Sequence, residues 1–536
     1  MNGLRFETAA PPLRPDPNRV DVACFIGHVA RRSGALPPAV IEGLAAQGWV
    51  VRDPELARGW RPGPWRADAA EIEALLHLPV AVESWAAFDA LFAWEARPLE
   101  VAGTRRCTTY LGAAVRSFFA HGGRRALIVR TGDPWPVLEP AGGRAAARDG
   151  RLAELLGPAS SPVEPASWRG LGQLFGLPEV ALVALPDLAD ACAADVATVA
   201  VALEPPDSPE VFVECSEGRE MPVREDVGLR SLAPPRCDEA GFLAWRDAIA
   251  TVRGRIARHH REMELVAALP LPRADLRSTA VAGTVWAQAD FAAWLARAGI
   301  LAAGIDDEKD ERGRGRPESA FVQFAWPWLR TRHGADLPSL LEPPDGLLAG
   351  LLARNALARG TFRSVAGTPL AAVHGSEPVL SWSGVAETPS ERLAARVCVV
   401  APAVDGWALR SDVSATALEP WRAGGVSRLL GAVLRAARRA GEAALFEANG
   451  PALWTEVRRS LEQTLLAFWR EGALGGASAE QAFVVRCDRS TMSQNDLDGG
   501  RVRAEIALLP VAAVERITVV LELSGGGAAL PVREVA

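Results

Sequence analysis

The sequence predicts an α/β protein: a helix-covered, mainly parallel sheet in the N-terminal and central part of the chain, followed by an α+β C-terminal domain. Two observations predict it. Buried-strand patterns alternate with amphipathic helical patterns over residues 20–215, and this alternation favours parallel strands with helices on both faces. The last 150 residues are more regular, with two long amphipathic helices among several strands.

The composition is that of a folded protein and excludes several classes. Of the 536 residues, 49% are hydrophobic and 23% are charged, which is too apolar for a disordered chain. The formal net charge of −7 offers no basic surface for nucleic acid. No apolar run approaches the roughly 20 residues of a membrane span, and the N-terminus lacks the pattern of a secretory signal. We therefore expect a soluble protein that is made in the cytoplasm.

The chain begins with an arm-like segment, followed by a strand–helix–strand pattern. Leu4 to Thr8 is strand-like, and the prolines between Pro11 and Pro17 cannot join a helix or the interior of a sheet. We next expect a strand over 20–27, closed by glycine, and then a strand followed by a helix capped by Ser84 over 79–92. A further helix over 109–120 and a further strand over 126–129 come after them.

The same pattern returns and then extends to the C-terminus. A strand at 180–185, a helix at 188–201 and a strand at 211–215 would continue the sheet, and 236–265 predicts one long helix with His259 and His260 on its surface. Later in the chain we expect two helices, over 426–440 and 452–469. We expect five strands there, over 396–402, 443–448, 482–487, 501–509 and 516–523. Ser478 and Gln481 resemble a capping box.

The sequence carries no motif of an active site. It has no glycine-rich phosphate loop, no nucleophile elbow and no zinc pattern, and its seven cysteines are widely spaced, as expected of buried, reduced thiols. Asp488, Asp496 and Asp498 lack the spacing of a calcium loop and are better explained as a polar turn. The 17 tryptophans are better explained by core packing than by carbohydrate stacking. We therefore expect no catalytic residue, no metal and no cofactor.

The motifs near the C-terminus resemble those of the tail sheath proteins of contractile phage tails and phage-tail-like contractile injection systems. Residues 482–501 read AFVVRCDRSTMSQNDLDGGR, which is similar to the family's F-x-V-x-C-D strand, its T-Q-x-D-I-D-x-G-R turn and the start of the next strand. The positions that match this motif are Phe483, Cys487, Asp488, Gln494, Asp496, Asp498, Gly500 and Arg501.

Segments of the N-terminal half are similar to the same family. Residues 24–27 resemble its A-A-F-V-G strand, and residues 82–92 resemble its S-W-x-x-F-x-x-L-F helix. Two segments differ, because residues 363–367 replace a K-A-P-A-N or K-A-P-A-G element and residues 411–416 replace a G-A-R-T-L strand. The likeness implies a sheath subunit, and these differences leave a specialised paralogue near the baseplate or the cap as an alternative.

The resemblance implies a structural protein that works by polymerising. The resemblance implies an N-terminal extended arm over residues 1–19 and an outer α/β portion over 20–374, with a subdomain boundary near 230. It further implies an inner C-terminal sheath domain over 375–515 and a C-terminal strand arm with its tail over 516–536. The strands at both ends would be donated to neighbouring subunits. Their residues are Leu4, Arg5, Phe6, Glu7, Thr8, Ile517, Thr518, Val519, Val520, Leu521, Glu522 and Leu523.

In this family the sheath assembles around an inner tube in an extended state and contracts to drive the tube through a target envelope. The implied partners are other copies of the chain, the inner tube protein, baseplate, terminator or cap proteins, and sheath paralogues, with no nucleic acid and no membrane insertion. The particle would be a phage tail or a tail-like device released from the cell. The rival from another class is a doubly wound α/β enzyme, which polar residues converging at the carboxyl ends of the parallel strands would favour. The sequence indicates no such cluster.

Overall fold

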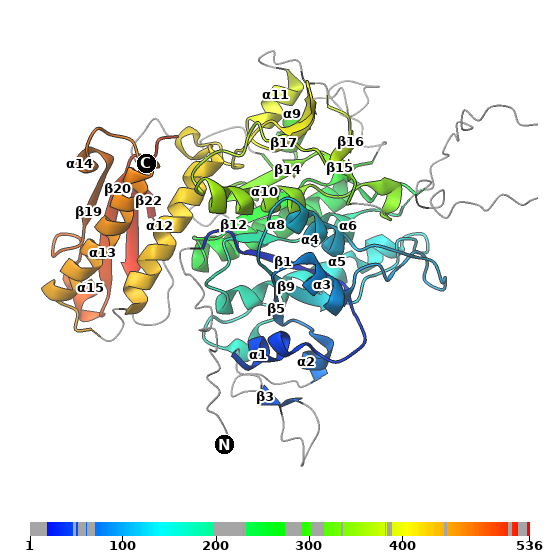
Figure 1. Cartoon of the computed structure of the whole chain (residues 1–536), viewed down its shortest axis with the longest axis horizontal. Coiled ribbons are helices and arrows are strands. Elements are labelled where there is room, and N and C mark those ends of the chain that lie inside the picture. The colour runs from blue at the N-terminus through cyan, green and yellow to red at the C-terminus, as the bar shows by residue number, and fades with distance from the viewer. Residues whose placement is uncertain are drawn as a thin grey trace, which may run out of the picture.

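A sheet of eight strands forms the centre of the larger part of the protein (Figure 1). The computed structural model describes residues 19–46, 50–51, 60–61, 70–196, 229, 232–273, 291–301, 316–333, 336–380, 382, 388–443, 447–512, 517–523 and 533–535. In spatial order the strands of the sheet are β18 (Gly406–Leu409), β17 (Cys398–Ala403), β14 (Val322–Trp326), β12 (Glu264–Ala268), β10 (Leu182–Ala184), β1 (Ala23–His28), β9 (Ala126–Gly132) and β5 (Pro79–Val82). The six inner strands are parallel and the two edge strands are antiparallel to their neighbours. The expected mainly parallel sheet is therefore confirmed.

Helices cover both faces of this sheet, as the alternation of residues along β1 illustrates. Cys24 and Ile26 belong to one apolar core, whereas Ala23 and Phe25 belong to the other. The first core includes residues of α5 (Gly143–Leu156), α6 (Leu188–Cys192), α8 (Glu239–His259), α9 (Phe291–Arg297) and α11 (Pro389–Ala394). The second includes residues of α1 (Pro38–Ala46), α2 (Ala70–Ala74), α3 (Trp85–Leu91), α4 (Tyr110–Ala120) and α10 (Asp345–Ala358).

Local signals in the sequence fix the start of one helix and the close approach of one helix pair. The Ser84 hydroxyl accepts a hydrogen bond from the Ala87 amide at 3.1 Å and so caps α3, as the sequence predicts. In the contact between α4 and α10, a Cβ atom placed on Gly346 would lie 2.3 Å from the Ala114 carbonyl oxygen. The two helices can approach this closely because residue 346 has no side chain.

Five short strand pairs lie outside the eight-stranded sheet among the described residues. They are β2 (Ala30–Arg31) with β6 (Phe92–Ala93), β3 (Val50–Val51) with β4 (Trp60–Arg61), β7 (Arg97–Pro98) with β8 (Arg106–Cys107), β11 (Arg236–Cys237) with β13 (Leu271–Pro272), and β15 (Trp328–Thr331) with β16 (Val373–Glu377).

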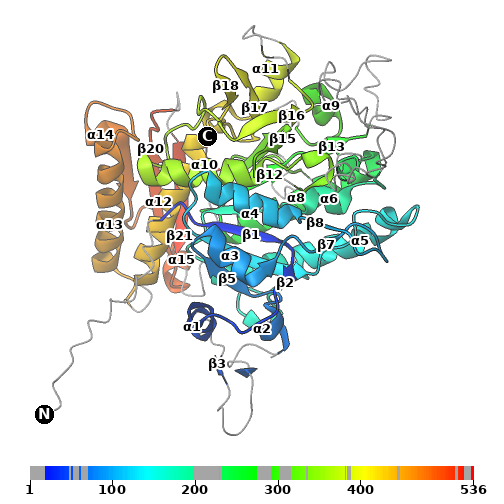
Figure 2. The same cartoon turned by 45° about the vertical axis from the view of Figure 1, so that its right-hand side comes forward.

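A second, antiparallel sheet forms a smaller C-terminal unit with its own core. Its order is β19 (Phe483–Arg486), β20 (Val502–Leu508), β21 (Ile517–Leu523) and β22 (Arg533–Val535). It is accompanied by α12 (Gly424–Ala443), α13 (Pro451–Arg470), α14 (Ala479–Ala482) and α15 (Gln494–Asp498). Figures 1 and 2 show this unit beside the larger part, with α12 between the two. Residues of α12, α13, β20 and β21 share one apolar cluster.

Several sequence expectations differ from the structure. The long helix expected over 236–265 ends at His259, because residues 264–268 are fully buried as a central strand of the sheet. The helix expected over 188–201 ends at Cys192, and the strand expected at 211–215 lies outside the described residues. Residues 444–446 of the strand expected at 443–448 also lie outside them. The Ser478 side chain makes no capping hydrogen bond to α14.

The division between the two sheets falls later than the expected domain boundary at 374/375. Strands β17 and β18 pair with β14 and with each other in the large sheet. The C-terminal unit therefore begins at α12, near Gly424. Cys398 and Val400 explain the difference, because both are buried in the cores of the large sheet.

Candidate functional site

The expected N-terminal arm, Leu4 to Thr8, lies outside the described residues, whereas the expected C-terminal strand lies within them. Ile517–Leu523 forms β21, which pairs along its whole length with β20, from Leu508 opposite Ile517 to Val502 opposite Leu523. On its other side Thr518 to Val520 pairs with β22. Within the single chain this strand therefore completes the sheet of its own C-terminal unit. Ile517 and Val519 point into the apolar core of that unit.

The other edge of this sheet is β19, whose outer side has no strand partner among the described residues. Val484 and Arg486 lie on this strand with exposed side chains. An edge of this kind offers main-chain amide and carbonyl groups to an added strand.

The residues of the sheath-like motif come together in the hairpin between β19 and β20. The Ser493 hydroxyl accepts from the Asp496 amide at 3.2 Å, and the Asp496 carboxylate accepts from the Ser493 amide at 3.0 Å, so these two residues form a capping box at α15. Arg501 lies 3.3 Å from the buried Asp496, and Gly500 has a positive φ of 65° that favours glycine. Phe483 on β19, Cys487 and Asp488 directly after it, and Gln494 and Asp498 in α15 complete the set. The motif shapes a turn, in agreement with the reading of the acidic residues as structural.

Helix α12 is attached to the large sheet by a buried ion pair near its N-terminus. Asp412, which follows β18, accepts hydrogen bonds from both terminal nitrogens of Arg428, at 2.8 and 2.6 Å. The Gln323 side-chain amide and the Val365 main-chain amide also donate to Asp412, each at 2.9 Å. Although burial alone would raise the pKa of Asp412, Arg428 and these hydrogen bonds hold it below its usual value.

Two further arginines of α12 bind the ends of strands in the large sheet. Arg435 donates to the carbonyl oxygens of Pro178 and Val180, the latter at 2.6 Å, just before β10. Arg438 pairs with Glu262 at 3.0 Å, just before β12, and donates to the His259 carbonyl at 2.9 Å. With the Arg428–Asp412 pair, these contacts hold the C-terminal unit firmly against the amino ends of the parallel strands.

A polar cluster does lie at the carboxyl ends of the parallel strands, which the sequence did not indicate. Asp187 accepts from the main-chain amides of His28 at 2.6 Å and Leu111 at 3.1 Å, and burial raises its pKa to about 6. Asp190 accepts from Arg97 at 2.6 Å, Arg144 at 3.0 Å and the Trp135 indole at 2.8 Å.

The pocket at this cluster is very small, and both of its aspartates are held by hydrogen bonds from neighbouring groups. The cavity among His28, Asp187 and Asp190 measures about 10 Å³, about enough for one water molecule and too small for a substrate. Burial disfavours the charged form of Asp190, but Arg144 and Arg97 hold its pKa below the usual value. The arrangement joins loops beyond the sheet and resembles a structural ion network more than an open active site.

Other candidate groups have structural surroundings. His260, expected at the surface, is only 2% exposed because the chain turns back beneath α12 after α8, and burial lowers its pKa to about 3. The described part of the chain holds no group of three or more potential metal ligands. Six cysteines are described, and all are buried and unpaired. None of the described helices is long and apolar enough to cross a membrane.

Comparison with known proteins gives a consistent picture of the fold. No family model matches the chain, and no curated protein matches its sequence. A chain in the contracted baseplate of the anti-feeding prophage matches 96% of this chain and 95% of its own length, with 16% identity and a TM-score of 0.52. A chain in the six-fold symmetrised baseplate of the same particle matches with 95% coverage of both chains, 17% identity and a TM-score of 0.51. The contracted helical sheath of that particle matches with 96% coverage of both chains, 18% identity and a TM-score of 0.49. The chain thus shares its fold, over nearly its whole length, with chains of the anti-feeding prophage baseplate.

Proposed function

We propose that the chain is a tail sheath subunit that polymerises into a helical sheath around an inner tube, and that contraction of this sheath drives the tube through a target envelope. The observation that carries the proposal is the sheath-like motif in the β19–β20 hairpin, together with the match over nearly the whole chain to chains of a contractile particle's baseplate. The pocket at the polar cluster, too small for a substrate, favours a structural role over the rival enzyme. The proposed partners are other copies of the chain, the inner tube, and baseplate and cap proteins.

The firm attachment of α12 supports movement of each subunit as one body. Arg428, Arg435 and Arg438 fix the C-terminal unit to the large sheet through buried contacts. A subunit of this kind can rotate within the lattice without changing its internal structure. In this proposal the C-terminal unit lies against the tube, and contraction is driven by greater burial and charge complementarity between subunits, added over many copies.

Strand exchange is the proposed link between subunits. Leu4 to Thr8 would add to an edge such as β19 of a neighbour, and Ile517–Leu523 would pair with a neighbour's β20. The register of β20 with β21 would then be the same as within the single chain, which is the geometry of a domain swap. The connection over 509–516 has eight residues, which can reach about 26 Å when extended. Every main-chain hydrogen bond of the sheet would be preserved.

A pair of cysteines tests this exchange directly. Ala507 and Thr518 are register partners on β20 and β21, and directly opposed residues of an antiparallel pair lie within disulfide reach. In oxidised particles, the A507C/T518C variant should give a ladder of covalently linked chains on a denaturing gel, whereas the A507C and T518C single variants should not. Tubes that yield only single chains with an internal disulfide would refute the exchange of β21.

The second candidate is a specialised sheath paralogue near the baseplate or the cap. Two matches with TM-scores above 0.5 come from baseplate structures. The segments that differ from the sheath motifs, 363–367 and 411–416, both contact Arg428 of α12 through Arg363 and Asp412. Antibody labelling of intact particles distinguishes the candidates, because a trunk subunit labels the whole length and a paralogue labels one end.

A further inference from the structure

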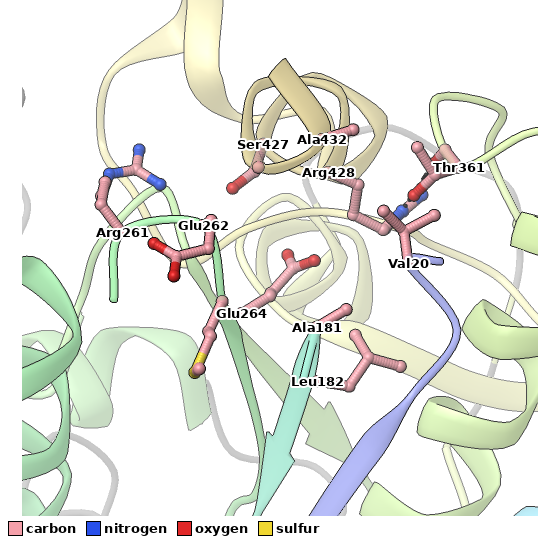
Figure 3. Close-up of a pocket in the computed structure, with 12 residues that line it drawn as sticks. Val20, Ala181, Leu182, Arg261, Glu262, Glu264, Thr361, Ser427, Arg428 and Ala432 are labelled. Atoms are coloured by element: carbon pink, nitrogen blue, oxygen red, sulfur yellow. Dashed lines mark hydrogen bonds between the residues drawn. The ribbon is translucent and has the colours of Figure 1, made fainter. Parts of the chain in front are cut away.

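A small cavity lies beneath α12, where this helix crosses the amino ends of β10 and β12 (Figure 3). Its volume of about 20 Å³ is enough for a single water molecule. Ser427 and Arg428 of α12 line it from one side, and Ala181, Leu182 and Glu264 line it from the sheet. The cavity is thus part of the contact that joins the two units of the protein.

Glu264 is the unusual group in this cavity. Its side chain is buried, and neither of its carboxyl oxygens has a hydrogen-bond partner among the described residues. Burial raises the pKa of Glu264 to about 8, opposed by Arg428 and supported by the nearby Asp412. A carboxyl group in this setting is uncharged at neutral pH.

The charged groups around Glu264 belong to α12, to the segment after β18 that carries Asp412, and to the segment just before β12. Arg428 of α12 lines the same cavity but is held by Asp412, through two hydrogen bonds. Arg261 and Glu262 lie on the segment just before β12, where Glu262 is paired with Arg438 of α12. The neighbouring strand β10 and the segment before β1 contribute only apolar groups to the lining of this cavity, Ala181, Leu182 and Val20.

We propose that Glu264 is a proton-dependent latch between the large sheet and α12. When it is uncharged, Arg428 remains on Asp412 and holds the N-terminal part of the helix in place. When Glu264 loses its proton, a second buried carboxylate competes for Arg428, and the cavity provides room for water to enter. The helix is then held less firmly, and with it the C-terminal unit.

The structure predicts the size of the effect on local opening of α12. In an opened state Glu264 meets water and has its ordinary pKa of 4.5, whereas in the closed state its pKa is about 8. Between these values the closed form holds one proton more than the open form, so rising pH favours opening. Opening should become about tenfold more frequent for each pH unit between 5.5 and 7.5, and should level off above pH 8.

Native-state hydrogen exchange of the full chain measures this opening. After correction for intrinsic exchange rates, the wild-type amides of α12 should lose protection with rising pH. In E264Q the slope of the logarithm of the opening constant against pH should be smaller by about one, the contribution of a single proton. E264M, which removes the carboxyl group without adding a polar one, should behave in the same way and serves if E264Q does not fold.

The matched control is E342Q. Glu342 is also fully buried with a raised pKa of about 8, but it accepts hydrogen bonds from Thr331 and Ser117 and lies away from α12. E342Q should leave the pH dependence of α12 unchanged. An unaltered dependence in E264Q and E264M, or an equal reduction in E342Q, would overturn the proposal.

Discussion

Replacing Asp412 by asparagine should strongly loosen the attachment of α12 to the large sheet. Asp412 is 6% exposed and accepts two hydrogen bonds from Arg428, one from Gln323 and one from the Val365 amide. Asparagine keeps the shape of the side chain but removes the charge. The Arg428 guanidinium would then remain buried without its counter-ion.

The expected loss is about 3–5 kcal/mol, the usual cost of breaking a buried ion pair from one side. The D412N/R428M double variant should lose much less than the sum of the two single variants, because no uncompensated charge remains in the protein interior. The attachment by Arg435 and Arg438 should persist in all of these variants.

Hydrogen exchange of α12 is the suitable assay, because a chain whose two units have separate cores need not unfold in one step. D412N should raise the equilibrium constant for opening of α12 by roughly 100-fold or more, the factor that corresponds to the expected loss of free energy. Protection within about fivefold of the wild type, or additive losses in the double variant, would show that this ion pair does not hold the helix.

Three further predictions concern helix packing, pH dependence and assembly. G346A should lower thermal stability by about 1–3 kcal/mol, because its Cβ would meet the Ala114 carbonyl at 2.3 Å, whereas G150A, with no atom within 4 Å, should be neutral or stabilising; equal melting temperatures would contradict this. E342Q should exceed the wild type in stability at pH 8 by up to about 4 kcal/mol and differ little at pH 5, because burial raises the pKa of Glu342 to about 8 and the native state therefore holds a proton that the unfolded chain releases; a gap independent of pH in denaturant titrations would be the contrary result. Deletion of residues 2–8 should leave a folded monomer that does not polymerise, and normal sheaths from this variant would refute the assignment of the arm.

Where local patterns decide the structure, the sequence predicted it closely. Ser84 caps its helix as expected, and β1, β5 and β9 lie where apolar runs bounded by glycine, proline or serine predicted them. The α12 and α13 helices follow from their periodic apolar residues, which face one shared core. In these segments the local preference and the global fold agree.

The misses arise where tertiary contacts override the local pattern. The helix expected over 236–265 includes residues 264 and 265, but these two residues begin the central strand β12. Asp190, which follows β10 in the sequence, meets Arg97 of β7 and Arg144 of α5 only in the folded chain, and no spacing along the chain records this. The Ser493–Asp496 capping box carries aspartate at its third position, whereas the usual pattern has glutamate or glutamine there, as in the Ser478 segment, which forms no cap.

Negative-stain electron microscopy of the purified full-length chain, alone and with its inner tube protein, tests the central claim most directly. The account predicts helical tubes with a regular axial repeat, formed by many copies of the chain. Dispersed single particles in both preparations would contradict a sheath-forming role.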